Sequence, residues 1–122
     1  MLPHQGAGVG QAFEDGLVLA TILSQPAVTL ANLPAALAIY DDVRRPYSQG
    51  VQEGSARNGD NYHLHRAGWE AVSAEDSSAG RYARGLVGAL EAALRAQTRW
   101  LFETSVLDGR EALRERVAAL AA

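Results

Sequence analysis

The chain opens with a glycine-rich loop that leads into a strongly apolar segment. Gly6, Gly8 and Gly10 alternate with other residues, and the apolar run Leu17 to Leu23 follows. Glycine lets a ligand approach the backbone, and the first N–H groups of a helix, together with the helix dipole, attract an anion. The spacing G-x-G-x-G differs from the dinucleotide fingerprint G-x-G-x-x-G, and no strand precedes it. By spacing alone, the loop therefore also fits a flexible helix start without a ligand.

The apolar segment predicts a first helix that begins within Gly6–Gly10 and ends near Ser24. Pro26 supports this end, because proline keeps the residue before it out of the helical region. Apolar side chains lie nearly all round this helix, so we expect other parts of a protein to cover it on most sides. One apolar face is formed by residues three or four positions apart, namely Val9, Phe13, Leu17 and Ala20.

Further patterns predict about four helices in all, so the fold class of this chain is mainly α. A second helix starts at Asn32-Leu33-Pro34, with Asn32 as its cap. Pro46 removes a backbone hydrogen bond from this helix and is expected to kink or break it.

The C-terminal half of the chain predicts the remaining two helices. The third spans about residues 79–104, capped by Ser77 or Ser78, and Asp108-Gly109-Arg110-Glu111 forms a capping box for the last. On the last helix, Leu113, Val117 and Leu120 share one side.

Composition excludes several functional classes. Hydrophobic residues make up 48% of the 122 residues and aromatic residues only 7%, which favours helices over sheets. A net charge of −3 argues against a nucleic-acid surface. There is no cysteine, which excludes disulfides and fits a reducing compartment. The longest apolar run is short for a membrane helix, which needs about 20 residues, so we expect a cytoplasmic chain without membrane or nucleic-acid partners.

Several polar residues resemble functional groups but fit a structural interpretation better. His63-x-His65 is the only metal-like pair, and no third ligand has a suitable spacing, so we predict no metal site. Glu14 and Asp15 are adjacent and are expected to point to different sides of the helix, which favours a structural role. The arginines, including Arg44, are scattered among carboxylates and are expected to lie on a solvated surface.

Two segments of the chain resemble one enzyme family. Pro3-His4-Gln5-Gly6-Ala7-Gly8, followed by Gln11 and Glu14-Asp15, resembles the third flavin-contacting segment of the FAD-dependent aromatic hydroxylases. The similarity is greatest to the salicylate-hydroxylase-like branch. Ala38–Pro46, then Ser55-Ala56-Arg57, resembles the helix that follows in that branch. The chain thus resembles the C-terminal part of an α/β FAD-binding monooxygenase fold whose earlier part, an N-terminal flavin domain, is missing here.

The resemblance implies FAD as cofactor, NAD(P)H as reductant and a small aromatic phenolic acid as substrate, hydroxylated with O₂. It implies no catalytic residue in this chain, because the family's acid–base residues lie mostly upstream. The residues it places against the flavin are Gly6, Ala7, Gly8, Val9 and Gly10. The residues it places near the substrate are Pro3, His4 and Gln5.

The resemblance also divides the chain. Residues 1–60 would be the C-terminal flavin-contacting loop and helices of an FAD-binding domain, and residues 61–122 a C-terminal helical region. Most of the surface that buries FAD is absent here, so the chain alone is expected to be inactive. The alternative is a non-catalytic small helical module, or a split-gene product that acts through a protein partner. The amphipathic C-terminal half of the chain supports this alternative.

Overall fold

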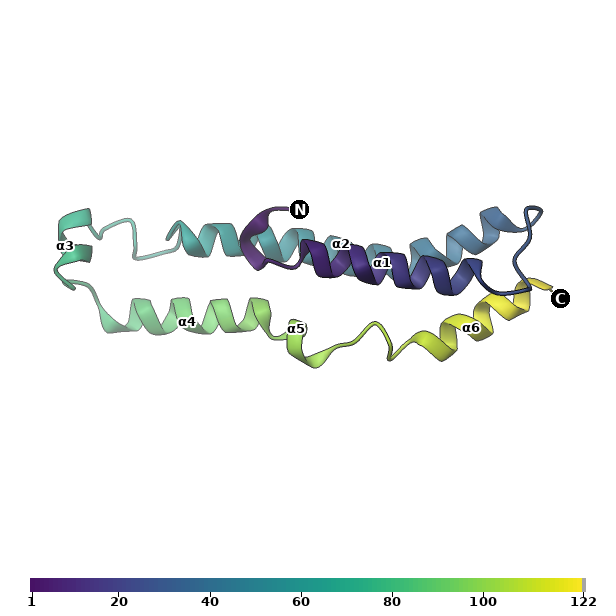
Figure 1. Ribbon diagram of the computed structural model, residues 1–122. Coiled ribbons are helices and arrows are strands. Elements are labelled where there is room, and N and C mark those ends of the chain that lie inside the picture. The colour runs from purple at the N-terminus through teal and green to yellow at the C-terminus, as the bar shows by residue number, and fades with distance from the viewer. Residues whose placement is uncertain (122) are drawn as a thin grey trace. The chain divides into compact units, whose positions relative to one another are not determined.

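The computed structural model describes residues 1–121, which are mainly helical and contain no strand (Figure 1). Its four longer helices contain 16, 30, 15 and 9 residues, which confirms the prediction of a mainly α chain. The elements in chain order are η1 (Pro3–Gln5), α1 (Gly8–Leu23), α2 (Leu33–Tyr62), α3 (Ala74–Ser78), α4 (Arg84–Thr98), α5 (Trp100–Glu103), α6 (Arg110–Ala118) and η2 (Ala119–Ala121).

The helices pack as two compact units, and α2 takes part in both. The α1–α6 unit contains residues 6–51 and the chain from residue 104 onward. The α4 unit contains residues 1–5 and 52–103. These units are defined by packing, whereas the predicted parts 1–60 and 61–122 are defined by function. The functional division therefore stays a prediction.

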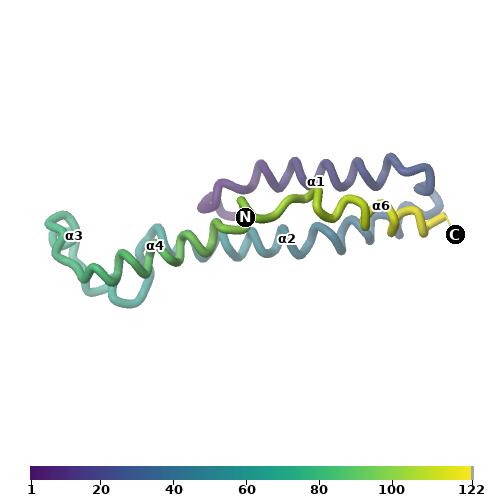
Figure 2. Tube along the Cα trace, turned by 90° about the horizontal axis from the view of Figure 1, so that it is seen from below, coloured from purple at the N-terminus to yellow at the C-terminus, as the bar shows by residue number. Residues whose placement is uncertain are grey.

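The core of the α1–α6 unit lies where three helices run side by side. Figure 2 shows α1, the first part of α2 and α6 next to one another. An ion pair of 3.0 Å between Arg116 of α6 and Asp42 of α2 lies beside this core. The predicted apolar side of the last helix is confirmed, because Leu113 and Val117 are buried there and Leu120 packs against them. The buried core residues are Val18, Ile22, Ala36, Ile39, Leu113 and Val117.

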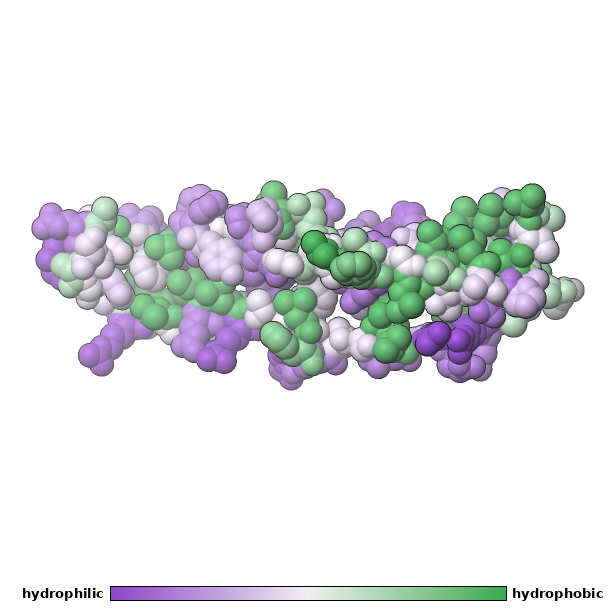
Figure 3. Space-filling view, in the orientation of Figure 1, coloured by the Kyte–Doolittle hydropathy of each residue, from purple (hydrophilic) through white to green (hydrophobic). Residues whose placement is uncertain are grey.

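The first helix has the predicted bounds but is covered on one side only. Val18 and Ile22 of α1 are buried, whereas the predicted face of Val9, Phe13, Leu17 and Ala20 is exposed. Phe13 is 75% exposed. Hydrophobic surface is visible along α1 in Figure 3. Within the described residues, the apolar face of α1 that starts beside the glycine loop has no covering partner.

The second helix begins as predicted, but its predicted cap is wrong and it does not break at Pro46. Asn32 does not cap α2, since its Oδ1 accepts a hydrogen bond from the N–H of Thr29 (2.7 Å) and its Nδ2 donates to the carbonyl of Ala27 (2.8 Å). The side chain therefore closes the preceding turn. Pro46 does not break the helix, which continues from Leu33 to Tyr62. Proline removes one backbone hydrogen bond from α2, and the helix has buried residues on both sides of Pro46.

The predicted caps of the C-terminal helices are also wrong. Ser73 caps α3, because its Oγ accepts a hydrogen bond from the N–H of Asp76. Neither Ser77 nor Ser78 is a cap. The long helix predicted over residues 79–104 is replaced by α4 and α5. Asp108 forms no capping box, because its Oδ2 accepts a hydrogen bond from the N–H of Ser105, and Gly109 occupies the cap position of α6.

We expect Asp76 to titrate at an unusually low pH. Hydrogen bonds from Ser73 and then Arg81 hold the pKa of the Asp76 carboxyl below its ordinary value. A carboxyl with a lowered pKa in the folded state stabilises that state at neutral pH, and the contribution disappears as the pH falls through that lowered pKa. An NMR titration of the side-chain carboxyl should show Ser73→Ala raising the pKa. Ser78→Ala is the control, since Ser78 bonds only to the Ala74 carbonyl; equal titration curves for the two variants would contradict the assignment.

Candidate functional site

The five residues predicted to contact flavin form the loop and first turn at the start of α1. Gly6 has a φ of 63°, a conformation that costs a residue with a side chain about 1–2 kcal/mol, and Ala7 takes the cap position. No side chain caps this helix, and no acidic residue lies in its first turn. A Cβ added at Gly10 would meet no atom within 4 Å. The positive end of α1 therefore has uncapped N–H donors and open space beside them, as an anionic or electronegative group requires.

The three residues predicted to lie near the substrate form η1, which packs on α2 in the α4 unit. The N–H of Leu2 donates to Ser55 Oγ (3.1 Å), and Asn58 Nδ2 donates to the carbonyl of His4 (3.2 Å). Ser55 and Asn58 are both completely buried. Gln5 Nε2 donates to the carbonyl of Gln97 (2.8 Å), while the buried Gln5 Oε1 has no hydrogen-bond partner within the described residues.

Two glycines of α2 allow this close packing. A Cβ at Gly54 would lie 2.7 Å from Gln5 Nε2, and a Cβ at Gly59 would lie 2.9 Å from His4 Cδ2. Such distances are shorter than atoms tolerate, so the side chains of His4 and Gln5 occupy space that only glycine leaves free. Gly54, Ser55, Asn58 and Gly59 thus hold the N-terminal segment, a role that the sequence analysis missed.

We expect Gly59→Ala to displace His4 without unfolding α2. Alanine raises helix propensity by up to about 1 kcal/mol, while its methyl group takes the place of the imidazole. The NMR contacts between the rings of His4 and Tyr62, whose centroids lie 6.0 Å apart, should be lost while the helical circular dichroism is kept. Gly50→Ala is the matched control, because a Cβ there meets no atom within 4 Å. Unchanged ring contacts in Gly59→Ala would show that His4 does not lie over Gly59.

All three histidines of the chain lie near one another in the α4 unit. The rings of His4 and His63 are 5.7 Å apart between centroids, and those of His63 and His65 are 5.6 Å apart. His65 Nδ1 lies 3.9 Å from Asp60 Oδ1. Residues 1–121 contain no group of three or more His, Cys, Asp or Glu side chains that could hold a metal ion. Within the same residues, no helix is long and apolar enough to cross a membrane.

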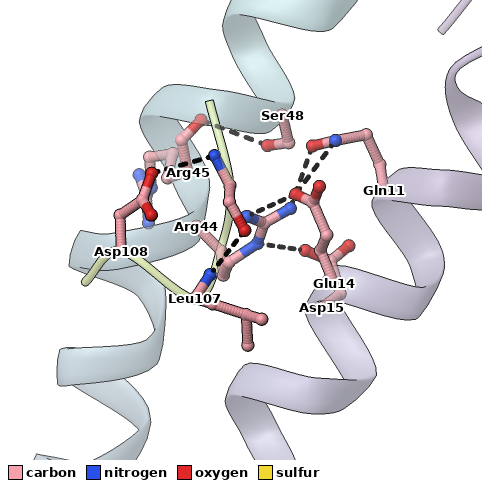
Figure 4. Close-up of polar contacts among 9 residues, drawn as sticks. Gln11, Glu14, Asp15, Arg44, Arg45, Ser48, Leu107 and Asp108 are labelled. Atoms are coloured by element: carbon pink, nitrogen blue, oxygen red, sulfur yellow. Dashed lines mark hydrogen bonds and ion pairs between the residues drawn. The ribbon is translucent and has the colours of Figure 1, made fainter. Parts of the chain in front are cut away.

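A buried arginine connects α2 to the start of α1. The side chain of Arg44 is 4% exposed, and each of its three nitrogens has a partner on α1 (Figure 4). Nε lies 2.6 Å from Asp15 Oδ1, one terminal nitrogen lies 3.0 Å from Glu14 Oε2, and the other donates to Gln11 Oε1 at 2.9 Å. Gln11 Nε2 also donates to Glu14 Oε2 (3.1 Å), which closes the network.

This arrangement corrects two predictions made from the sequence. Arg44 does not lie on a solvated surface, and Glu14 and Asp15 bind the same guanidinium although they are adjacent in the helix. The signal was present in the i, i+3 and i, i+4 spacing of Gln11, Glu14 and Asp15, which places all three on neighbouring positions of one helix side. The neighbouring Arg45 differs, because it is exposed and pairs with Asp41 on its own helix.

Part of the chain is similar in sequence to known flavin-dependent enzymes. The chain is 47% identical over 64 residues to a salicylate hydroxylase from Pseudomonas putida, which is 52% of this chain and 15% of that enzyme. It is 40% identical over 77 residues to the FAD-dependent monooxygenase atnJ from an Arthrinium species, which is 63% of this chain and 18% of that protein. A third relative is the FAD-dependent monooxygenase str9 from Strobilurus tenacellus, 46% identical over 52 residues, which is 43% of this chain and 11% of that protein.

Each match covers a small share of the relative and about half of this chain. The two segments in which we noted the family resemblance likewise lie within about half of the chain. No family model and no solved structure matches the chain significantly. The helical architecture is consistent with the C-terminal part of the relatives' fold. In sequence, the chain is similar to a segment of salicylate-hydroxylase-like FAD-dependent monooxygenases, and it spans about 15% of the length of the salicylate hydroxylases it matches.

Proposed function

We propose that this chain is the C-terminal flavin-contacting segment of a cytoplasmic FAD-dependent monooxygenase that hydroxylates a small phenolic acid with NAD(P)H and O₂. The observation that carries the proposal is the start of α1. Its N-terminus is uncapped, carries no acidic side chain in the first turn and is open beside Gly10. This start coincides with the glycine-rich motif that resembles the family's flavin segment.

In such an enzyme the bound FAD supplies the redox chemistry that activates oxygen. The residues of this chain then bind and orient that cofactor. The N–H groups of Gly8, Val9 and Gly10 would hold an electronegative part of the flavin, and the dipole of α1 favours negative charge at the same place. Pro3, His4 and Gln5 would lie beside the aromatic substrate.

The missing partner of the chain is the rest of the flavin domain. The face of α1 that contains Val9, Phe13 and Leu17 is apolar and exposed. An N-terminal flavin domain would cover this face and bury the remainder of FAD. Because affinity for a cofactor comes from such burial, we expect the isolated chain to retain no flavin after gel filtration and to oxidise no NADH.

The mass of the native polypeptide in its source cells tests this proposal. An antibody raised against residues 111–120 should detect a band much heavier than the 13.0 kDa of this chain. The polypeptide captured by that antibody should show flavin absorbance and hydroxylate salicylate-like acids. A single band at 13.0 kDa without flavin would contradict the proposal.

The alternative function is a small helical module that acts through a protein partner. The observation in its favour is the core of the α1–α6 unit, which three helices close within the chain itself. A monomeric chain with one cooperative melting transition would support the module. A chain that aggregates through the exposed face of α1 would support the enzyme segment.

A further inference from the structure

Arg44 contacts the part of α1 that immediately follows the glycine loop. Its three partners, Gln11, Glu14 and Asp15, begin one residue after Gly10. The N–H of Gln11 donates to the carbonyl of Ala7 (2.9 Å), so the same residue is bonded both to the loop and to the guanidinium. Gln11 is itself 4% exposed, so its side chain lies in the interior of the unit.

The geometry of the Arg44 guanidinium fixes the orientation of α1 as well as its contact with α2. Arginine presents its donors in a rigid planar fork, and all three nitrogens are engaged with side chains from successive turns of one helix. The Tyr47 ring packs against the guanidinium, with 5.4 Å between Cζ and the ring centroid. A helix held at residues 11, 14 and 15 has little freedom to rotate or tilt in its first turn.

The positive charge of Arg44 has a second effect on the start of α1. Glu14 and Asp15 bring two negative charges close to a helix end that must accept an electronegative group. Five residues of helix separate Val9 from Glu14, which is about 7.5 Å along the axis and within the distance over which salt fails to screen charges fully. The buried guanidinium compensates one of these two negative charges.

We propose that Arg44 is a positioning residue for the flavin: it sets the orientation of the N–H groups of Gly8–Gly10 and shields them from the carboxylates of Glu14 and Asp15. This inference rests on the proposed function, because it concerns the same flavin-contacting loop. It adds a specific residue, remote from the loop in sequence, on which flavin affinity and reduction potential depend.

The first test uses the 122-residue chain and needs no flavin. Hydrogen exchange of the backbone N–H groups of residues 11–15 should become about tenfold faster in Arg44→Met, a change that corresponds to an opening free energy lower by about 1.4 kcal/mol. Exchange at the C-terminal end of α1 should change much less. Arg45→Met is the matched control, since Arg45 is adjacent, exposed and paired only along α2. Equal exchange in the two variants would overturn the proposal.

The second test uses the native flavin-containing polypeptide. Arg44→Met should weaken FAD binding about tenfold or more and shift the reduction potential of the bound flavin to more negative values, because uncompensated carboxylates oppose the added negative charge. Arg44→Lys keeps the charge but loses the fork, so it should weaken binding with a smaller change in potential.

The outcomes separate this inference from the proposed function. A wild-type polypeptide without flavin would overturn the proposed function and this inference with it. A wild-type polypeptide with flavin whose Arg44→Met variant matches Arg45→Met in affinity and potential would overturn the inference alone. An altered affinity with an unchanged potential in Arg44→Met would overturn the shielding part of the proposal and keep the orienting part.

Discussion

Replacing Ile22 with alanine is expected to lower the free energy of unfolding of the chain by about 2–5 kcal/mol. Ile22 is completely buried in the α1–α6 unit, in one cluster with Ala36 and Ile39 of α2 and Val117 of α6. Removing most of this side chain leaves a cavity where three helices meet. The total stability of a small domain is about 5–15 kcal/mol, so the loss is a large fraction of it. A urea titration followed by circular dichroism measures the change.

Two further variants make this result specific. Ile22→Val removes one methyl group from the same place and should cost about 0.5–1.5 kcal/mol. Leu30→Ala removes a side chain that is 91% exposed and should change stability by less than about 0.5 kcal/mol. If Ile22→Ala and Leu30→Ala unfold at the same urea concentration, the core does not lie between these three helices.

The helices could be predicted from sequence because their apolar periodicity and their end signals agree. Pro26 fixes the end of α1, and the side of α6 formed by Leu113 and Val117 repeats with helical spacing. Caps were predicted less well. Asn32, Ser73 and Asp108 each bond to a neighbouring backbone group, and several local partners compete for such short polar side chains. The sequence does not show which partner is chosen, because that choice depends on how the following helix packs.

The sequence predicts the part of the candidate site that is continuous in the chain. It does not predict the part formed by residues far apart in sequence. The glycine loop is continuous, so its motif and its place at the start of α1 are both readable. Arg44 lies far from the loop in sequence, and only the pairing of α1 with α2 brings it to Gln11, Glu14 and Asp15. The roles of Gly54 and Gly59 could not be predicted for the same reason. Their lack of side chains has a purpose only once residues 3–5 lie against α2.

Replacing Phe13 with alanine is expected to have very different effects in two forms of the protein. In the 122-residue chain Phe13 is 75% exposed, so the change in stability should be less than about 0.5 kcal/mol. In the proposed full-length monooxygenase the rest of the flavin domain covers this face of α1, and the same substitution should cost about 3–5 kcal/mol. Thermal or urea unfolding of both forms, each with and without the substitution, measures the difference.

The control for this comparison is Phe102→Ala. Phe102 is 87% exposed and lies outside the segments that resemble the flavin enzymes, so its loss should be nearly neutral in both forms. The contrast between Phe13 and Phe102 removes the general effect of deleting an exposed aromatic ring. A large cost for Phe13→Ala in the longer form alone means that α1 is an internal helix of a flavin domain, which is why it is apolar nearly all round. A negligible cost in both forms means that this face never acquires a cover, and the helical module then becomes the better explanation of the chain.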